Sequence, residues 1–203
     1  MAIRQRDESR LRILLAQECA RIMADEGVKD FLLAKRKAAA RLGVANKALL
    51  PGNVEIEQAL LEYQRLFKSA EQPVQLRALR EAAIEAMHFF ARFRPCLVGS
   101  VLAGTAGPYS DINLHLFADT PEEVVLFLME HNIPFETAER RLRLGNGEYM
   151  YFPVFSFGAG EMNIELTVFP PEAKREAPRS PVDGRPMRRA SLAAVQALLD
   201  EDH

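Results

Sequence analysis

The spacing of apolar residues along the chain changes near Pro95. Before this point, apolar residues recur every three or four positions, as they do on amphipathic helices. After it, they alternate with polar residues in short runs, as they do on strands with one buried face. The pattern predicts an α/β chain of the α+β kind. A helical N-terminal region (1–72) should precede a small mixed β-sheet core (73–170), and a linker with a short C-terminal helix should follow (171–203).

Four helices are predicted ahead of the change in period. The first carries apolar residues from Leu11 to Met23, and Gly27 is placed to end it. Asn53 follows a Pro-Gly break and is suited to be the N-cap of the third helix. The second, third and fourth helices are expected over about residues 30–42, 53–67 and 73–90.

The region after Pro95 should contain strands and two helices. A Thr cap, a proline at the first helical position and a glutamate at the third mark a strong helix start at Thr120. Glycine-bearing turns at 145–147 and 158–160 separate the last strands. The strands are expected over about residues 96–98, 111–116, 135–144, 148–157 and 161–169, and the helices over about 120–132 and 190–199.

The composition is that of a globular protein. Apolar residues make up 48% and charged residues 27% of the 203 positions. No apolar run approaches the roughly 20 residues that a membrane-spanning helix needs, and the first residues lack a secretory apolar stretch. We therefore expect a cytoplasmic protein with no membrane partner. The two cysteines, Cys19 and Cys96, fit no metal spacing and are expected to be buried free thiols.

Charge is distributed unevenly, although the formal net charge is only −2. Residues 1–50 carry 11 Lys/Arg against 6 Asp/Glu, whereas residues 95–169 carry 3 against 10. The acidic middle suits a divalent metal and opposes nonspecific nucleic-acid binding by that part alone. A basic stripe on the second predicted helix can contact nucleic-acid phosphates or be an ordinary solvated helix face. The stripe consists of Lys35, Arg36, Lys37 and Arg41.

One constellation in the acidic middle points to nucleotide chemistry. Gly99-Ser100 ends a short strand, and after ten intervening residues Asp111 opens another. Nucleotide transfer needs small residues that let backbone N–H groups approach a triphosphate. It also needs about three carboxylates from neighbouring strands, so that two metal ions can hold the attacking and leaving oxygens. Asp111 and Asn113 share one strand face, and Glu165 lies on the polar face of a later strand.

This pattern resembles the signature of the DNA polymerase β-type nucleotidyltransferase superfamily over roughly residues 75–170. That signature is an apolar residue, Gly, Gly or Ser, a spacer, and then Asp, an apolar residue, Asp or Glu, and another apolar residue. The resemblance implies transfer of a nucleoside monophosphate from a nucleoside triphosphate to an acceptor with the help of Mg²⁺. The residues it implies are Asp111 and Glu165 as catalytic metal ligands, Asn113 as a weak metal ligand, and Gly99 and Ser100 beside the triphosphate.

The sequence departs from the signature at Asn113, which stands where the superfamily has its second carboxylate. An amide offers a metal one oxygen but no charge, so Asp111 and Glu165 alone should hold two dications weakly. His115 shares the strand face of Asp111 and Asn113 and can be a substitute metal ligand, a phosphate contact or an ordinary hydrogen-bonded strand histidine. The loop Gly104–Gly107 can cradle phosphate or simply connect two elements.

Other patterns are assigned to structure. Arg188-Arg189 before Ser191 is interpreted as the entry to a Ser-capped helix. Segments 34–43 and 180–192 resemble bacterial proteins that join a basic helical arm to a nucleotidyltransferase-like core, a likeness that implies no particular activity. Four aromatic residues that alternate along one strand face are interpreted as core rather than as a stacking platform. They are Tyr149, Tyr151, Phe155 and Phe157.

The sequence is consistent with three functions. The first is a nucleotidyltransferase. The second is a catalytically inactive module of the same fold that binds a nucleotide or a partner, and the missing carboxylate at Asn113 favours it over catalysis. The third is a nucleic-acid-associated protein that uses the basic N-terminal arm.

Overall fold

The computed structural model describes the backbone of residues 2–201 and the side chains of residues 7–200. Within that range it contains seven α-helices and a five-stranded mixed sheet, which confirms the predicted α+β class. The chain forms two compact units. The helical unit runs to residue 73 and includes the short segments 107–109 and 181–183, and the sheet unit contains the rest. None of the described helices is long and apolar enough to cross a membrane.

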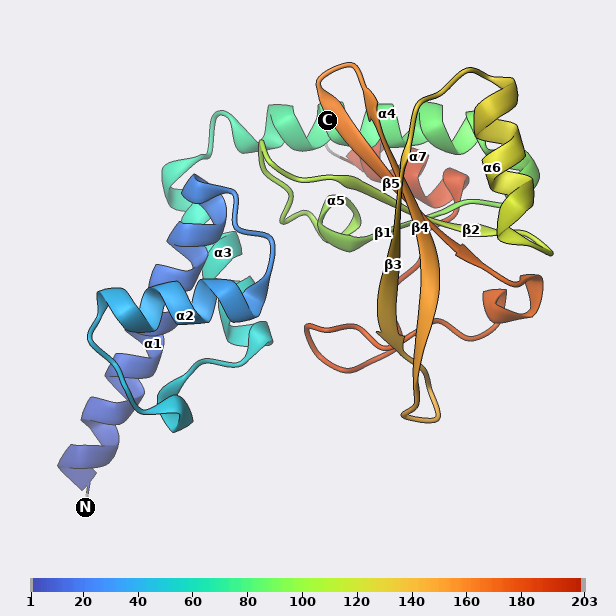
Figure 1. Cartoon of the computed structure of the whole chain (residues 1–203). Coiled ribbons are helices and arrows are strands. Elements are labelled where there is room, and N and C mark those ends of the chain that lie inside the picture. Colours follow the sequence, from blue (N-terminus) through green and yellow to red (C-terminus); the bar gives the residue numbers. More distant parts are fainter. Residues whose placement is uncertain (1, 202–203) are drawn as a thin grey trace. The chain divides into compact units, whose positions relative to one another are not determined.

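The helical unit contains α1 (Ala2–Glu26), α2 (Phe31–Arg41) and α3 (Asn53–Phe67), which are labelled in Figure 1. A short 3-10 helix, η1 (Lys47–Leu49), lies between α2 and α3. Apolar side chains from all three long helices pack into one core. Its buried members are Leu15, Cys19, Ile22, Ala34, Ala38 and Ile56. The helices therefore stand where the apolar spacing predicted them.

The ends of these helices follow local sequence. Gly27 and Gly43 have positive φ angles of 68° and 66°, which glycine adopts without steric cost, and they follow α1 and α2. The prediction that Asn53 caps α3 is wrong, because Asn53 is the first helical residue and Gly52 is the cap. The Glu55 carboxylate accepts a hydrogen bond from the Gly52 N–H at 2.6 Å and supplies the capping interaction instead.

The sheet unit alternates helices with strands. Its elements in chain order are α4 (Gln72–Phe89), η2 (Ala91–Phe93), β1 (Cys96–Val98), α5 (Gly99–Ala103), β2 (Ile112–Phe117), α6 (Pro121–Glu130), β3 (Glu136–Arg143), β4 (Tyr149–Ala159), β5 (Met162–Phe169), η3 (Pro171–Lys174) and α7 (Leu192–Glu201). Helix α6 begins with the predicted capping box, in which the Thr120 N–H donates to the Glu123 carboxylate at 3.2 Å.

The five strands are ordered β1-β2-β5-β4-β3. Strands β2 and β5 run parallel, and the other neighbouring strands run antiparallel. Strand β4 pairs with β5 only over Val154–Ala159, whereas its first residues, Tyr149–Pro153, pair with β3 alone. The beginning of β4 and the end of β3 therefore form a two-stranded ribbon outside the five-stranded sheet, visible as a long hairpin in Figure 1.

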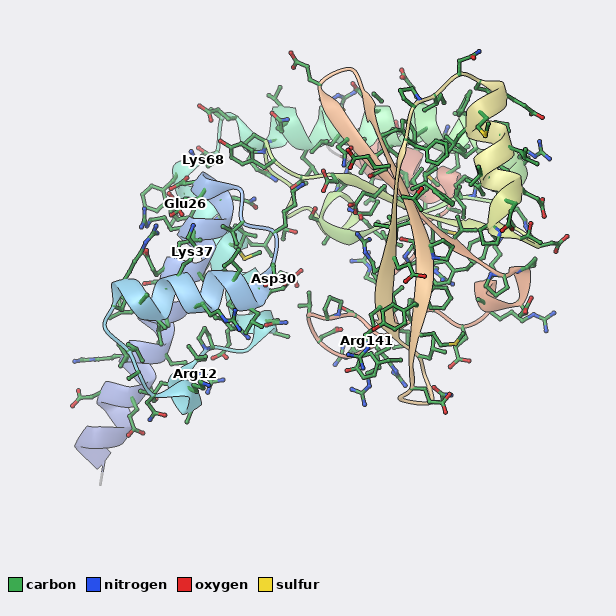
Figure 2. All side chains as sticks on the ribbon, viewed as in Figure 1. Arg12, Glu26, Asp30, Lys37, Lys68 and Arg141 are labelled. Carbon is green, nitrogen blue, oxygen red and sulfur yellow. The ribbon has the colours of Figure 1, made fainter. Side chains whose placement is uncertain are left out.

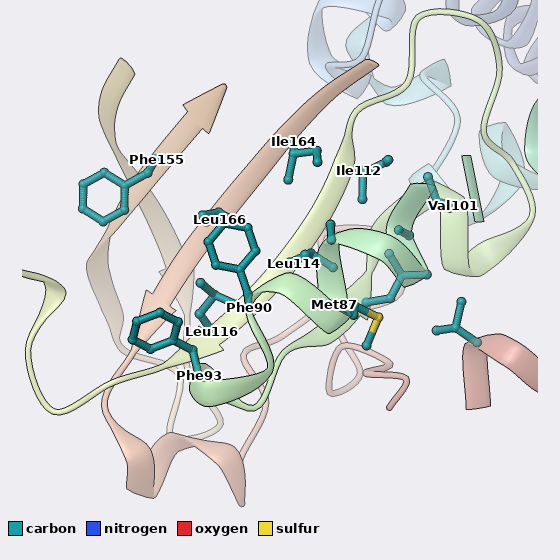
Figure 3. Packing of buried hydrophobic residues seen from close by; sticks show 14 of the residues in the cluster. Met87, Phe90, Phe93, Val101, Ile112, Leu114, Leu116, Phe155, Ile164 and Leu166 are labelled. Atoms are coloured by element: carbon teal, nitrogen blue, oxygen red, sulfur yellow. The ribbon is translucent and has the colours of Figure 1, made fainter. Parts of the chain in front are cut away.

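Helices cover one face of the sheet. Figure 3 shows Met87 of α4 and the following Phe90 among apolar side chains of the central strands, including Leu114 and Leu166. The opposite face carries a smaller apolar cluster at one end, which consists of Cys96, Phe117, Phe152 and Phe169. Both cysteines are buried free thiols, as predicted. Beyond that cluster, the opposite face carries the polar side chains of Asn113 and Glu165 beside the buried Val98 and Val154.

The interpretation of four alternating aromatic residues as core is right for two of them and wrong for the others. Phe155 and Phe157 are buried in the main core. Tyr149 and Tyr151 are 54% and 63% exposed. The reason is that both tyrosines lie on the two-stranded ribbon, before the first residue of β4 that pairs with β5.

Candidate functional site

The polar part of the sheet face opposite the helices brings the predicted site residues together. Asn113 on β2 lies directly beside Glu165 on β5, because the two parallel strands pair at these residues. Asp111 immediately precedes β2, and its Oδ1 accepts a hydrogen bond from Asn163 Nδ2 at 3.2 Å. All four side chains are partly buried. The three residues that the resemblance implies for a metal therefore meet at the paired strands β2 and β5.

Arg140 on β3 joins two of these residues. Its Nη2 donates to Glu165 Oε2 at 2.6 Å, and its Nη1 donates to Asn113 Oδ1 at 3.3 Å. The ion pair is half open to solvent, with the Arg140 side chain 37% exposed and the Glu165 side chain 22% exposed. A guanidinium group therefore contacts the two oxygens that Glu165 and Asn113 would offer to a metal.

The amide of Asn113 fits this arrangement in a way that a carboxylate cannot. Its Oδ1 accepts from Arg140, and its Nδ2 donates to the backbone carbonyl of Asp111 at 3.1 Å. A carboxylate has no hydrogen to donate. An aspartate here would lose the bond to that carbonyl and would add negative charge near Asp111 and Glu165. Asn113 therefore suits a neutral, hydrogen-bonded role between two acids.

Gly99 and Ser100 lie on the β1 side of Asn113. Val98 pairs with Asn113 across β1 and β2, and Gly99 follows as the first residue of α5. Gly99 has a φ angle of 76°, and a Cβ added there would lie 3.6 Å from Asn113 Nδ2. Glycine thus lets the backbone turn beside Asn113. In the loop after α5, the Thr105 N–H donates to the Ser100 carbonyl at 3.0 Å and is used within the fold.

His115 lies two residues further along β2 in a closed environment. It is 2% exposed, and its Nδ1 accepts a hydrogen bond from Arg189 Nε at 3.0 Å. Burial is the main cause that lowers the pKa of His115 to about 3, and the positive charges of Arg189 and Arg140 contribute to this shift. The Arg189 guanidinium lies 5.0 Å from the ring centres of Phe117 and Phe169. His115 is therefore a neutral acceptor within the fold, and its Nδ1 is engaged by Arg189.

The donor set of Asp111, Asn113 and Glu165 fits one magnesium ion but not two. Proteins usually hold Mg²⁺ through one or two carboxylates, with substrate phosphates and water completing the shell. Two carboxylates and one amide oxygen meet that need once Glu165 releases Arg140. A second ion would require a further acid. In the part of the chain that the structure describes, no three His, Cys, Asp or Glu side chains are grouped to hold a metal.

The basic stripe of α2 makes contacts mainly within the helical unit. Three of its four side chains have partners on α1 or α3. The pairs are Lys37 with Glu26 (2.7 Å), Arg41 with Glu26 (2.6 Å) and Glu18 (3.1 Å), and Lys35 with Asn53 (2.6 Å). Arg36 is exposed. The stripe therefore ties α2 to its neighbours and leaves less positive charge for a ligand than the sequence suggested.

Arg140 and Arg189 were not predicted as site residues. A signal for Arg140 existed, because the three Lys/Arg of the acidic segment 95–169 all fall within residues 140–143. The Arg189–His115 contact gave no local signal, since it joins residues 74 positions apart. No relative supplies further roles: comparisons with known protein families, with curated proteins and with solved structures find no match for this chain.

Proposed function

We propose that the chain is a nucleotidyltransferase-like protein that binds a nucleoside triphosphate at Asp111, Asn113 and Glu165. The strand pairing carries this proposal: Asn113 lies between Glu165 on β5 and Val98 of β1, directly before Gly99. This is the juxtaposition that the sequence signature requires, with a small-residue turn on one side of the motif strand and a later acid on the other. A partly buried polar surface with converging charged groups also suits a charged ligand.

Each residue has a distinct role in this proposal. Arg140 supplies positive charge for the phosphates, because its half-exposed side chain can turn from Glu165 toward a ligand. Glu165 and Asp111 then hold one Mg²⁺, which neutralises phosphate charge when it is bound. Gly99 allows the backbone to approach the triphosphate closely. The reaction is attack of an acceptor oxygen on the α-phosphorus, with pyrophosphate as the leaving group.

A second candidate is nucleotide binding without transfer. The observation that favours it is the contact of Arg140 with both Glu165 and Asn113, which places a guanidinium where a metal would need these oxygens. Asn113 also removes one negative charge from the motif, so a two-metal reaction lacks an acid. The two candidates share one site and differ in whether the α-phosphate is transferred.

Calorimetric titration with each nucleoside triphosphate, with and without Mg²⁺, tests binding. We expect saturable binding that Mg²⁺ strengthens, and Glu165→Gln should abolish the Mg²⁺-dependent part. The matched control is Glu161→Gln, which removes an exposed acid at the turn before β5. Failure of every nucleotide to bind the wild type contradicts both candidates.

Incubation with nucleotides labelled at the α-phosphate separates the two candidates. Label that becomes attached to an acceptor, or to the protein itself, supports transfer. Binding that is measurable by calorimetry but gives neither labelled product nor pyrophosphate selects the binding module. Glu165→Gln should remove any transfer that is found, and Glu161→Gln should leave it unchanged.

A further inference from the structure

The β3–β4 ribbon carries arginines and tyrosines in register on one face. Arg141 pairs with Tyr151, and Arg143 pairs with Tyr149, across the two antiparallel strands. Residues two apart on a strand share a face, so all four side chains point to the same side. All four are exposed. The Arg141 guanidinium lies 4.1 Å from the centre of the Tyr149 ring, a close cation–π contact, and Figure 2 shows Arg141 on this hairpin.

Positive charge in this region is concentrated on the ribbon. Segment 95–169 has 10 acids, and its only Lys/Arg residues are Arg140, Arg141 and Arg143. Arg140 belongs to the other face, where it pairs with Glu165. Arg141 and Arg143 therefore form an exposed cationic pair inside an otherwise acidic segment. Glu139 is the acid that shares their face, and it lies at the sheet end of the ribbon, opposite Pro153.

We propose that this ribbon face binds single-stranded nucleic acid. Exposed aromatic rings offer stacking surfaces to unpaired bases, and adjacent guanidinium groups contact the phosphates and can stack as well. Tyr149 and Tyr151 are separated by two strand positions, about 7 Å, and an extended single strand can place successive bases on them. The chemistry favours this ligand over a duplex, which buries its base faces, and over an acidic peptide, which has no use for the exposed tyrosine rings.

The ribbon face is separate from the proposed nucleotide site. Arg140 and Arg141 are neighbours on β3 and point to opposite sheet faces. A substitution of Glu165 that abolishes mononucleotide binding leaves the ribbon side chains in place. Substitution of the ribbon side chains likewise leaves Arg140 and Glu165 in place. The two ideas can therefore fail separately.

Fluorescence anisotropy with labelled oligonucleotides of about 12 nucleotides tests the inference. Single-stranded RNA, single-stranded DNA and the corresponding duplex are each titrated with the 203-residue chain at two salt concentrations. We expect single strands to bind more tightly than the duplex, and binding to weaken as salt rises. The chain has four tyrosines and no tryptophan, so quenching of tyrosine fluorescence gives a second readout of stacking.

Variants of the ribbon separate stacking from charge. Tyr149→Ala with Tyr151→Ala should weaken single-strand binding by roughly fivefold or more per ring, and phenylalanine at both positions should restore it. Arg141→Ala with Arg143→Ala should reduce the slope of log affinity against log salt by about 1.4. The control is Arg36→Ala with Lys47→Ala, which removes two exposed positive charges from the helical unit and should change neither value.

Four results would overturn the proposal. One is no binding of any single strand to the wild type at low salt. Another is equal affinity for the duplex, which would indicate charge without stacking. The third is wild-type affinity in the tyrosine double variant. The fourth is a loss of affinity in the Arg36/Lys47 control that equals the loss in the Arg141/Arg143 variant. All the substituted side chains are exposed, and circular dichroism of each variant checks that the fold is retained.

Discussion

Two arginines contact the same face of the sheet in opposite surroundings. Arg189 lies over the rings of Phe117 and Phe169 at the apolar end of that face. Arg140 lies at the polar end, where it forms a half-exposed ion pair with Glu165. Both are cations beside strand β2, yet one is enclosed by rings and the other is held by a carboxylate.

The difference teaches which arginine is free to respond to a ligand. Arg189 donates to three neutral acceptors, which are His115 Nδ1 and the carbonyls of Ala173 and Lys174, and none of its hydrogen bonds to the described residues goes to an acid. Its Nη2 is buried without a hydrogen-bond partner in the part of the chain that the structure describes. Burial accordingly lowers the pKa of Arg189. Arg189 therefore closes the apolar end of the face, whereas Arg140 can exchange Glu165 for another anion at low cost.

The largest expected effect is on stability, from Arg189→Met. The substitution leaves His115 Nδ1 and the Ala173 carbonyl without this donor and removes the cation–π contacts. We expect a loss of about 2–4 kcal/mol in the free energy of unfolding. Urea unfolding followed by circular dichroism measures it.

The matched control for that experiment is Arg140→Met, which breaks a half-exposed ion pair. It should change the free energy of unfolding by about 1 kcal/mol or less. Equal losses in the two variants would remove the distinction between a structural and a ligand-responsive arginine. A stabilised Arg189→Met protein would show that the buried charge costs more than its contacts return.

The second largest effect is a dependence of the free energy of unfolding on pH. It arises from His115, which accepts a hydrogen bond from Arg189. The pKa of His115 is about 3 in the folded protein and about 6.5 in the unfolded chain. Between these values only the unfolded chain binds the proton, so stability is complete above about pH 6.5 and is lost as pH falls toward 3. The slope should reach about 1.4 kcal/mol per pH unit.

The contribution of His115 is measured from the unfolding free energies of His115→Gln at several pH values between about 3 and 6.5. Glutamine keeps an acceptor for Arg189 but does not titrate, so the dependence on pH should be shallower than in the wild type. His88→Gln changes an exposed histidine of α4 and should leave the slope as it is. Identical slopes in all three proteins would mean that His115 is not the titrating group.

The sequence predicted the features that depend on local signals. The capping box at Thr120, the helix end at Gly27 and the period-2 strands are examples, because neighbouring residues determine each of them. Period 2 also placed Asn113 and His115 on one face of β2. The period-2 pattern could not predict that this face has a polar end and an apolar end, because side chains that contact the face, such as Arg189, come from distant positions in the sequence.

Strand pairing was the other feature that the sequence did not predict. Arg140 reaches Glu165 only because β3, β4 and β5 pair in a particular register, and no local pattern fixes a register between segments. Strand pairing also explains the tyrosines. Tyr151 and Phe155 share one face of β4, but only the second lies where β5 continues the sheet. Alternation predicts which face a side chain takes, and pairing decides whether anything covers that face.

The third prediction tests the polar end directly. Arg140→Gln should weaken nucleoside triphosphate binding about tenfold, because a charge-assisted contact with phosphate is lost, and Arg140→Lys should recover part of it. Calorimetry with the nucleotide that binds the wild type gives the affinities. Arg141→Gln is the matched control, since it removes the neighbouring charge from the opposite face of β3 and should leave this affinity unchanged. Tighter nucleotide binding in Arg140→Gln would identify Arg140 as a competitor of the ligand.

The smallest effect is expected from Asn113→Asp, which introduces a carboxylate at the position where the nucleotidyltransferase signature has one. It removes the bond to the Asp111 carbonyl and adds charge near Glu165, so the melting temperature without metal should fall by a few degrees, about 1 kcal/mol. Bound Mg²⁺ or Mn²⁺ relieves that repulsion, so the rise on adding metal and nucleotide should exceed that of the wild type. Asp111→Asn should show the reverse. The matched control is Asn46→Asp, at an exposed N-cap in the helical unit where aspartate caps as well as asparagine, and it should show neither effect. Melting curves that do not respond to metal in Asn113→Asp would mean that the polar end of the face is built for Arg140 alone.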